Sequence, residues 1–123
     1  LYIERRKLWE KYSERISDLD STGSLRVIRP PESVEHNAHM FAIQLASSTE
    51  ADRVRNSLNA SGIGAVIHYV PLHTSKVGKN LGYSPSDLPI TVEYSSRLLR
   101  LPLHHEMTNE DIDHIISSLE LLF

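Results

Sequence analysis

The sequence predicts a single α+β domain in which a small sheet carries helices on one face. Segments with helical and strand periodicity follow one another in the order helix, strand, helix, strand, loop with helix, strand, helix. The length of 123 residues fits one domain that buries its own core. Hydrophobic residues make up 40% and charged residues 24% of the chain, which is typical of a globular protein rather than a disordered one.

The N-terminal segment predicts an amphipathic helix. Apolar residues from Leu1 to Leu19 recur at steps of three, four or seven, and charged residues occupy the opposite side. We expect this helix to end by Gly23, because glycine suits a helix stop. The stretch after it is expected to be extended until Pro30 and Pro31, which cannot donate to a sheet ladder.

Two strands and a helix between them are predicted in the middle of the chain. Residues 39–46 (HMFAIQLA) alternate between two faces, which is the period of a strand. Thr49 as the N-cap, with Asp52 three residues later, predicts a helix that ends at Gly62. The run 65–70 (AVIHYV) then predicts a second core strand with alternate residues on opposite faces.

The C-terminal part contains a long connection and a well-marked last helix. Residues 71–89 contain too many glycines and prolines for a regular element, and a connection of that length is usually functional or disordered. A short helix over 90–99 and a strand over 98–104 (LLRLPLH) are predicted next. Thr108 as the N-cap and Asp111 at N3 then predict a helix whose apolar residues share one face.

Composition argues against several classes of partner. The formal net charge of −3 gives no basic surface for nucleic acid or for an anionic membrane. No apolar run approaches the roughly 20 residues that a membrane-spanning helix needs. The chain has no cysteine, which excludes disulfides and thiolate chemistry and fits a cytoplasmic protein.

The seven histidines do not form a recognisable metal or hydrolase motif. None of them has the helical i, i+4 spacing that holds zinc well, and we expect no dedicated metal site. No serine lies in a Gly-x-Ser-x-Gly turn, so a serine hydrolase is disfavoured.

The stretch GIGAVIHYVPLH, residues 62–73, is the strongest candidate for a binding site. His68 and His73 flank Tyr69 and Pro71 at the exit of the predicted strand. Such a cluster could bind a hydroxylated or phosphorylated ligand through neutral-pH donors. The alternative is that His68 only satisfies a hydrogen bond in the core.

These residues also resemble a known family. GIGAVIHYVPLH, followed by SRLLRLPLH and MTNEDIDHIISSL, closely resembles the C-terminal segment of the DegT/DnrJ/EryC1/StrS sugar aminotransferases. The resemblance implies the C-terminal small domain of a fold-type I transferase, with a mainly antiparallel sheet. Residues 1–22 would be the connecting helix and residues 23–123 the α+β core. Val70 stands where the family usually has proline, so we expect a less rigid loop.

The resemblance implies a pyridoxal-phosphate-dependent enzyme, active as a homodimer. Within the family, the motifs look most like the branch that transfers an amino group from glutamate to dTDP-4-keto-6-deoxy-D-glucose. In that family the Schiff-base lysine and the bound pyridoxal phosphate both lie in a large domain, which this chain lacks. Lys76 and Lys79 follow the histidine motif, where the family places no such lysine, so we expect them to be solvated and the fragment to be inactive alone.

The same resemblance assigns substrate contacts to His68, Tyr69 and His73. By resemblance, the small domain closes over the cleft, and its histidine loop lies near the nucleotide-sugar. The alternative from another class is a free-standing small-molecule-binding or regulatory domain without catalysis. If the chain is a severed domain, we expect Trp9 and Tyr12 to form an exposed contact patch.

Overall fold

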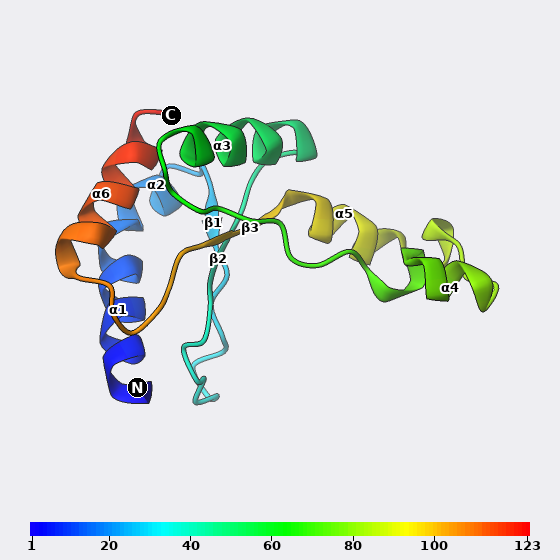
Figure 1. The fold of residues 1–123 in the computed structure, drawn as a ribbon, viewed down its shortest axis with the longest axis horizontal. Helices are drawn as coiled ribbons and strands as arrows, with labels where there is room; N and C mark the ends of the chain where they lie inside the picture. The colour runs from blue at the N-terminus through cyan, green and yellow to red at the C-terminus, as the bar shows by residue number, and fades with distance from the viewer.

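The computed structural model describes residues 1–123 and contains a small antiparallel sheet with helices packed on one face and a further helical segment extending on the other side (Figure 1). The strands are β1 (Arg26–Val27), β2 (Phe41–Gln44) and β3 (Leu98–Leu101), in the order β1-β2-β3. Both pairs are antiparallel. The predicted fold class is confirmed.

The register separates the two faces of the sheet. Residues directly opposite in an antiparallel pair lie on the same face. One face is therefore entirely apolar and buried, and its members are Val27, Phe41, Ile43, Leu99 and Leu101. The other face is formed by Arg26, Ala42, Gln44, Leu98 and Arg100.

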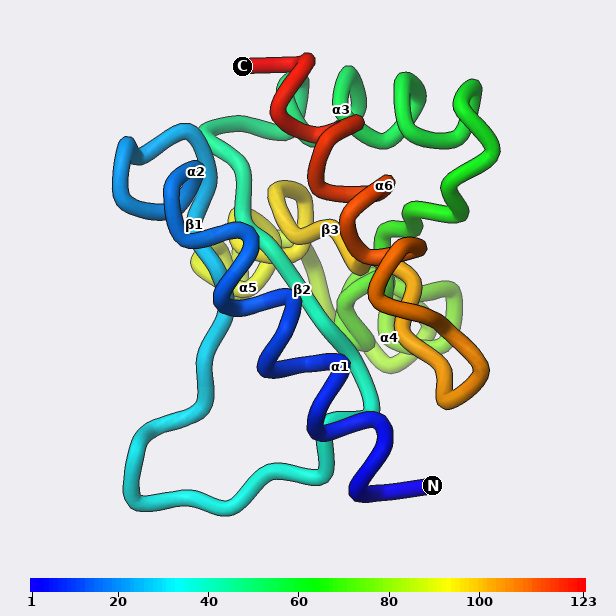
Figure 2. Tube along the Cα trace, turned by 90° about the vertical axis from the view of Figure 1, so that its left-hand side faces the viewer, coloured from blue at the N-terminus to red at the C-terminus, as the bar shows by residue number.

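Helices cover the apolar face. They are α1 (Tyr2–Arg15), with the short α2 (Ser17–Ser21) after it, α3 (Ser48–Ala60) and α6 (Asn109–Glu120). Figure 2 looks at the molecule from the side of α1 and α6, and the sheet lies behind them. The helices and this face share one cluster of buried apolar side chains, which is the core of the domain.

The expected exposed patch of Trp9 and Tyr12 is wrong. Tyr12 is completely buried and stacks on Phe41 with ring centroids 4.6 Å apart. Trp9 is half-buried, at 5.5 Å from the same ring. Both side chains lie on the core-facing side of α1, so the sheet covers the aromatic surface that we expected to be exposed.

The predicted N-cap residue is correct for α6, whereas the N-cap predicted for α3 is two residues too late. Thr108 and Asp111 form a reciprocal capping box at the start of α6, as predicted. The N-cap of α3 is Ser47 rather than Thr49, because the Ser47 hydroxyl accepts the Glu50 N–H at 3.1 Å. Gly62 follows the end of α3 with φ of +79°, the left-handed conformation that glycine adopts without strain.

The second core strand predicted at residues 65–70 is wrong. Only Val66 pairs with a strand, through an antiparallel bridge to Arg100. Toward the N-terminus the next ladder pair would be Gly64 with Pro102, and proline has no N–H to donate, while the Ala65 N–H points away from β3 and donates to the Asn59 side chain. Beyond the bridge, Tyr69 and Val70 are exposed, because no apolar surface lies there to cover them.

The long connection contains short helices rather than none. They are the 3₁₀ helices η1 (Leu72–Thr74) and η2 (Pro85–Asp87), with the α-helix α4 (Lys76–Asn80) between them. The helix α5 (Pro89–Arg97) follows, where the sequence predicts a short helix. In Figure 1 the segment with α4 projects away from α1 and α6, and in Figure 2 α4 and α5 lie behind the sheet. We call residues 71–88 the arm.

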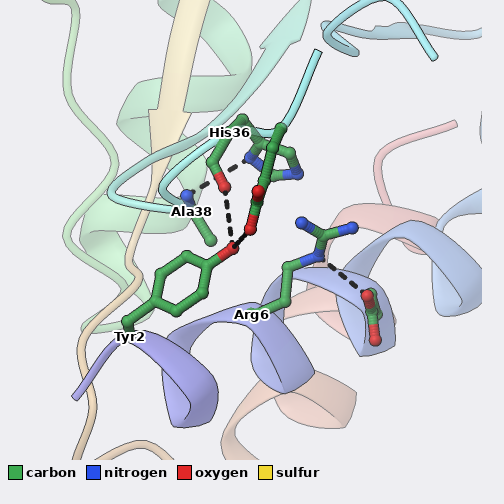
Figure 3. Close-up of polar contacts among 6 residues, drawn as sticks. Tyr2, Arg6, His36 and Ala38 are labelled. Atoms are coloured by element: carbon green, nitrogen blue, oxygen red, sulfur yellow. Dashed lines mark hydrogen bonds and ion pairs between the residues drawn. The ribbon is translucent and has the colours of Figure 1, made fainter. Parts of the chain in front are cut away.

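The loop between β1 and β2 is fastened to α1 (Figure 3). The Tyr2 hydroxyl donates to a carboxylate oxygen of Glu35 at 2.9 Å. Within the loop, the Ala38 N–H donates to His36 Nδ1 at 3.3 Å. The His36 ring also meets the Trp9 ring edge to face, with centroids 4.5 Å apart. These contacts bring a histidine from a surface loop against the first helix.

Candidate functional site

His68 and Tyr69 form the first part of the candidate site, immediately after the bridge at Val66. Their rings stack with centroids 4.5 Å apart and an interplanar angle of 9°. His68 is half-buried, whereas Tyr69 is 68% exposed. The pair therefore offers an open aromatic surface with a hydroxyl at its edge.

The hydrogen bond from Arg100 determines which ring nitrogen of His68 carries the proton. Arg100 Nη1 lies 2.8 Å from His68 Nδ1. A guanidinium only donates hydrogen bonds, so Nδ1 is the acceptor and the neutral ring carries its proton on Nε2. His68 therefore keeps an Nε2–H donor for another partner.

His73 forms a second part, inside the arm. It is 8% exposed, and its Nε2 atom is buried without a hydrogen-bond partner. The side chain lines an open pocket of about 1060 Å³ between η1, α4, η2 and α5. The rest of the lining includes apolar side chains and one carboxylate, Asp87.

Gly78 makes the arm compact enough to hold His73. A Cβ atom at Gly78 would lie 2.5 Å from the His73 carbonyl oxygen and slightly closer to the Leu72 carbonyl oxygen. No side chain fits there, so α4 packs directly on η1. Ser75 caps α4 by accepting the Gly78 N–H at 3.1 Å, which fixes the same junction.

The structure therefore joins two of the three predicted site residues. His68 and Tyr69 are in contact, but no hydrogen bond or ring contact connects either of them to His73. Sequence reasoning missed Arg100. The available signal was its place between Leu99 and Leu101, which puts it on the opposite side of a strand whose leucines face the core.

The remaining histidines do not add a second site. His104, His105 and His114 are exposed, and no group of three or more His, Asp or Glu side chains could hold a metal ion. No helix has both the length and the apolar character needed to cross a membrane.

Comparison with known proteins assigns the family. The family model described as DegT/DnrJ/EryC1/StrS aminotransferase family matches residues 1–120. The chain belongs to this aminotransferase family. The spore coat polysaccharide biosynthesis protein SpsC of Bacillus subtilis (strain 168) is 28% identical over 88 residues, which are 68% of this chain and 23% of SpsC.

Solved structures of aminotransferases share the fold. An aminotransferase of the family from Brucella abortus is 29% identical with a TM-score of 0.78, over 97% of this chain and 30% of that one. Spr1654 of Streptococcus pneumoniae, described as a sugar aminotransferase and solved in a PLP form, is 23% identical with a TM-score of 0.88. That match covers 99% of this chain and 31% of Spr1654. The chain thus spans less than a third of these relatives.

The residues of this chain do not fit the pyridoxal phosphate that the family implies. That cofactor needs a lysine that forms a Schiff base and an acidic partner for its ring nitrogen. No lysine of the chain is buried, and Lys76 and Lys79 lie exposed on α4, as expected. The chain therefore has no buried lysine that fits the role of the reactive amine.

Proposed function

We propose that this chain is the C-terminal small domain of a longer pyridoxal-phosphate-dependent sugar aminotransferase, with residues 1–22 as the connecting helix. The family match over residues 1–120 supports this proposal, together with its coverage of less than a third of the solved relatives. The lysine and the cofactor would come from the preceding large domain. Pyridoxal phosphate, when bound there, supplies the electron sink for amino transfer.

The proposed role of this domain is to bind the sugar substrate. His68, Tyr69 and His73 would contact the nucleotide-sugar, His68 by its Nε2–H and Tyr69 by its exposed ring and hydroxyl. The observation that carries this role is the position of His73, which lines an open pocket and whose Nε2 atom is buried without a hydrogen-bond partner. A buried nitrogen without a partner is costly, and a ligand hydroxyl or phosphate would satisfy it.

The proposed reaction is transfer of the amino group of glutamate to dTDP-4-keto-6-deoxy-D-glucose. The histidine motif and the LLRLPL strand support this substrate through their resemblance to that branch of the family. A polysaccharide pathway agrees with the name of the relative SpsC. We further propose that the protein is a cytoplasmic homodimer without nucleic-acid or membrane partners.

Amino transfer by the full gene product tests the proposal. The protein that contains this chain is incubated with pyridoxal phosphate, glutamate and the keto sugar nucleotide, and the amino sugar is detected by mass spectrometry. We expect a product with the full protein and none with residues 1–123 alone. If the gene encodes no segment ahead of this chain, or if the full protein binds the nucleotide-sugar without converting it, the alternative of a free-standing binding domain is favoured.

A further inference from the structure

Arg100 lies on the face of the sheet that the core helices leave open. In the register of β2 and β3 it is opposite Ala42, and on its other side it bridges to Val66. Val66 precedes His68 by two residues, so the bridge brings the histidine motif beside the Arg100 side chain. The hydrogen bond of 2.8 Å between the two side chains follows from this pairing.

Arg100 differs from most other arginines of the chain in having no counter-charge. Arg6, Arg15, Arg29, Arg53, Arg55 and Arg97 each form an ion pair with a carboxylate. Arg100 forms none, although its side chain is half-buried, and its only side-chain partner is the neutral ring of His68. A partly desolvated guanidinium without an anion is unfavourable.

The donors of Arg100 remain largely unused. A guanidinium has five N–H donors in a planar fork that matches carboxylate and phosphate groups, and His68 accepts from one nitrogen of that fork. The stacked rings of His68 and Tyr69 stand beside it and contribute an Nε2–H and a hydroxyl. These donors together suit a group with several acceptor oxygens.

We propose that Arg100 binds an oxyanion of a substrate, and that His68 is its positioning residue through Nδ1. The proposal rests on the proposed function, since that function supplies two such oxyanions, the carboxylate of the amino donor and the diphosphate of the nucleotide-sugar. Both are recognised by the same charge-assisted hydrogen bonds. Titration with two separate probes, one for each oxyanion, distinguishes the carboxylate from the diphosphate.

Calorimetric titration of the full protein with thymidine diphosphate and with glutarate tests the proposal. We expect Arg100→Gln to weaken the binding of one probe by at least about tenfold, the loss typical of a hydrogen bond to a charged group. The affinity of Arg100→Lys, which keeps the charge but loses the planar fork of donors, should lie between those of the unmodified protein and Arg100→Gln. Arg26→Gln is the matched control, because Arg26 lies on the same face, is exposed and has no ion pair; it should change either affinity by less than about twofold.

Rescue separates the role of His68 from a general effect on folding. The side-chain oxygen of His68→Asn can accept from Arg100 near the position of Nδ1, whereas His68→Leu has no acceptor. We expect the asparagine variant to retain most of the Arg100-dependent affinity and the leucine variant to lose it, with unchanged urea unfolding midpoints for both. Equal binding of both probes to Arg100→Gln and to the unmodified protein would overturn the inference and leave the proposed function standing. Failure of the unmodified protein to bind either probe would overturn both.

Discussion

The Tyr12 hydroxyl donates a hydrogen bond of 2.7 Å to the carbonyl oxygen of Pro102, across 90 residues of sequence. This bond joins the first helix to the end of β3, the strand that carries Arg100. Tyr12 is completely buried and Pro102 is partly buried, so the hydroxyl has no access to water. The packing of α1 against the sheet therefore fixes the end of β3, the strand on which the candidate site depends.

Loss of this hydroxyl should destabilise the domain. Tyr12→Phe removes the donor to the partly buried Pro102 carbonyl, and we expect the free energy of unfolding to fall by about 1 kcal/mol. Urea denaturation measures the change. Tyr2→Phe is the control, since Tyr2 is exposed and its hydrogen bond to Glu35 should contribute little. Equal losses for the two variants would contradict the assignment.

Tyr12 should also make the fold sensitive to alkaline pH. Burial, with a smaller contribution from the Asp111 charge, raises the pKa of Tyr12 far above its usual value. Above about pH 10 the unfolded chain releases this proton and the folded chain keeps it, so stability falls as pH rises. Tyr12→Phe should flatten the decline of the unfolding free energy between pH 9 and pH 11. An unchanged slope would show that other groups cause it.

The two possible caps of α3 give a direct test of the helix start. Ser47→Ala removes the acceptor of the Glu50 N–H, and we expect a loss of about 1 kcal/mol in unfolding free energy. Thr49→Ala should cost less than about 0.5 kcal/mol, because Thr49 is an exposed residue inside the first turn. Thermal or urea unfolding of both variants decides between them. The reverse order would restore Thr49 as the cap.

His36 should make stability depend on pH near neutrality. Burial against α1 lowers the pKa of His36, and the nearby positive charge of Arg6 lowers it further, while Glu10 opposes the shift. The unfolded chain therefore binds this proton more readily, so the contribution to stability is present above about pH 6.5 and is lost as pH falls. We expect His36→Asn, which does not titrate, to show a smaller loss of unfolding free energy between pH 7.5 and pH 5. His105→Asn is the exposed control, and equal slopes for His36→Asn and the unmodified protein would contradict the prediction.

Gly78 gives a test of how the arm holds His73. A methyl group at Gly78 collides with the Leu72 and His73 carbonyls, and we expect Gly78→Ala to destabilise the arm locally by about 1 to 3 kcal/mol. Hydrogen exchange should accelerate over residues 72–83 and stay unchanged in α1 and α6. Gly64→Ala is the matched control, because nothing lies within 4 Å of a Cβ there. Unchanged exchange in the arm would mean that α4 and η1 can separate without cost.

Much of the fold was predictable because its signals are local. The capping box of α6 and the period of its apolar residues are contained within a few residues, and the structure reproduces both. The alternation of β2 and β3 also located those strands. The strand predicted at residues 65–70 is wrong because an apolar run does not reveal whether a neighbouring strand can pair along its whole length. Only Val66 pairs with β3.

The site was predictable only in part for a related reason. The histidine motif identified His68, Tyr69 and His73 by their spacing and by resemblance. Their separation into a stacked pair and a buried arm residue does not follow from that spacing, because Gly78 packs on the backbone of η1 next to His73 whereas His68 and Tyr69 stack on each other. The pairing of His68 with Arg100 joins positions 32 residues apart, and no local pattern encodes it.

Steady-state kinetics of His73→Ala in the full aminotransferase tests the central claim most directly. If His73 binds the sugar substrate, the KM for the keto sugar nucleotide should rise about tenfold while kcat changes much less, since the lost hydrogen bond contributes to binding rather than to the chemical step. The KM for glutamate should stay the same, and Lys79→Ala, an exposed change on the same arm, should alter neither constant. A KM for the nucleotide-sugar within about twofold of the unmodified enzyme would contradict the account.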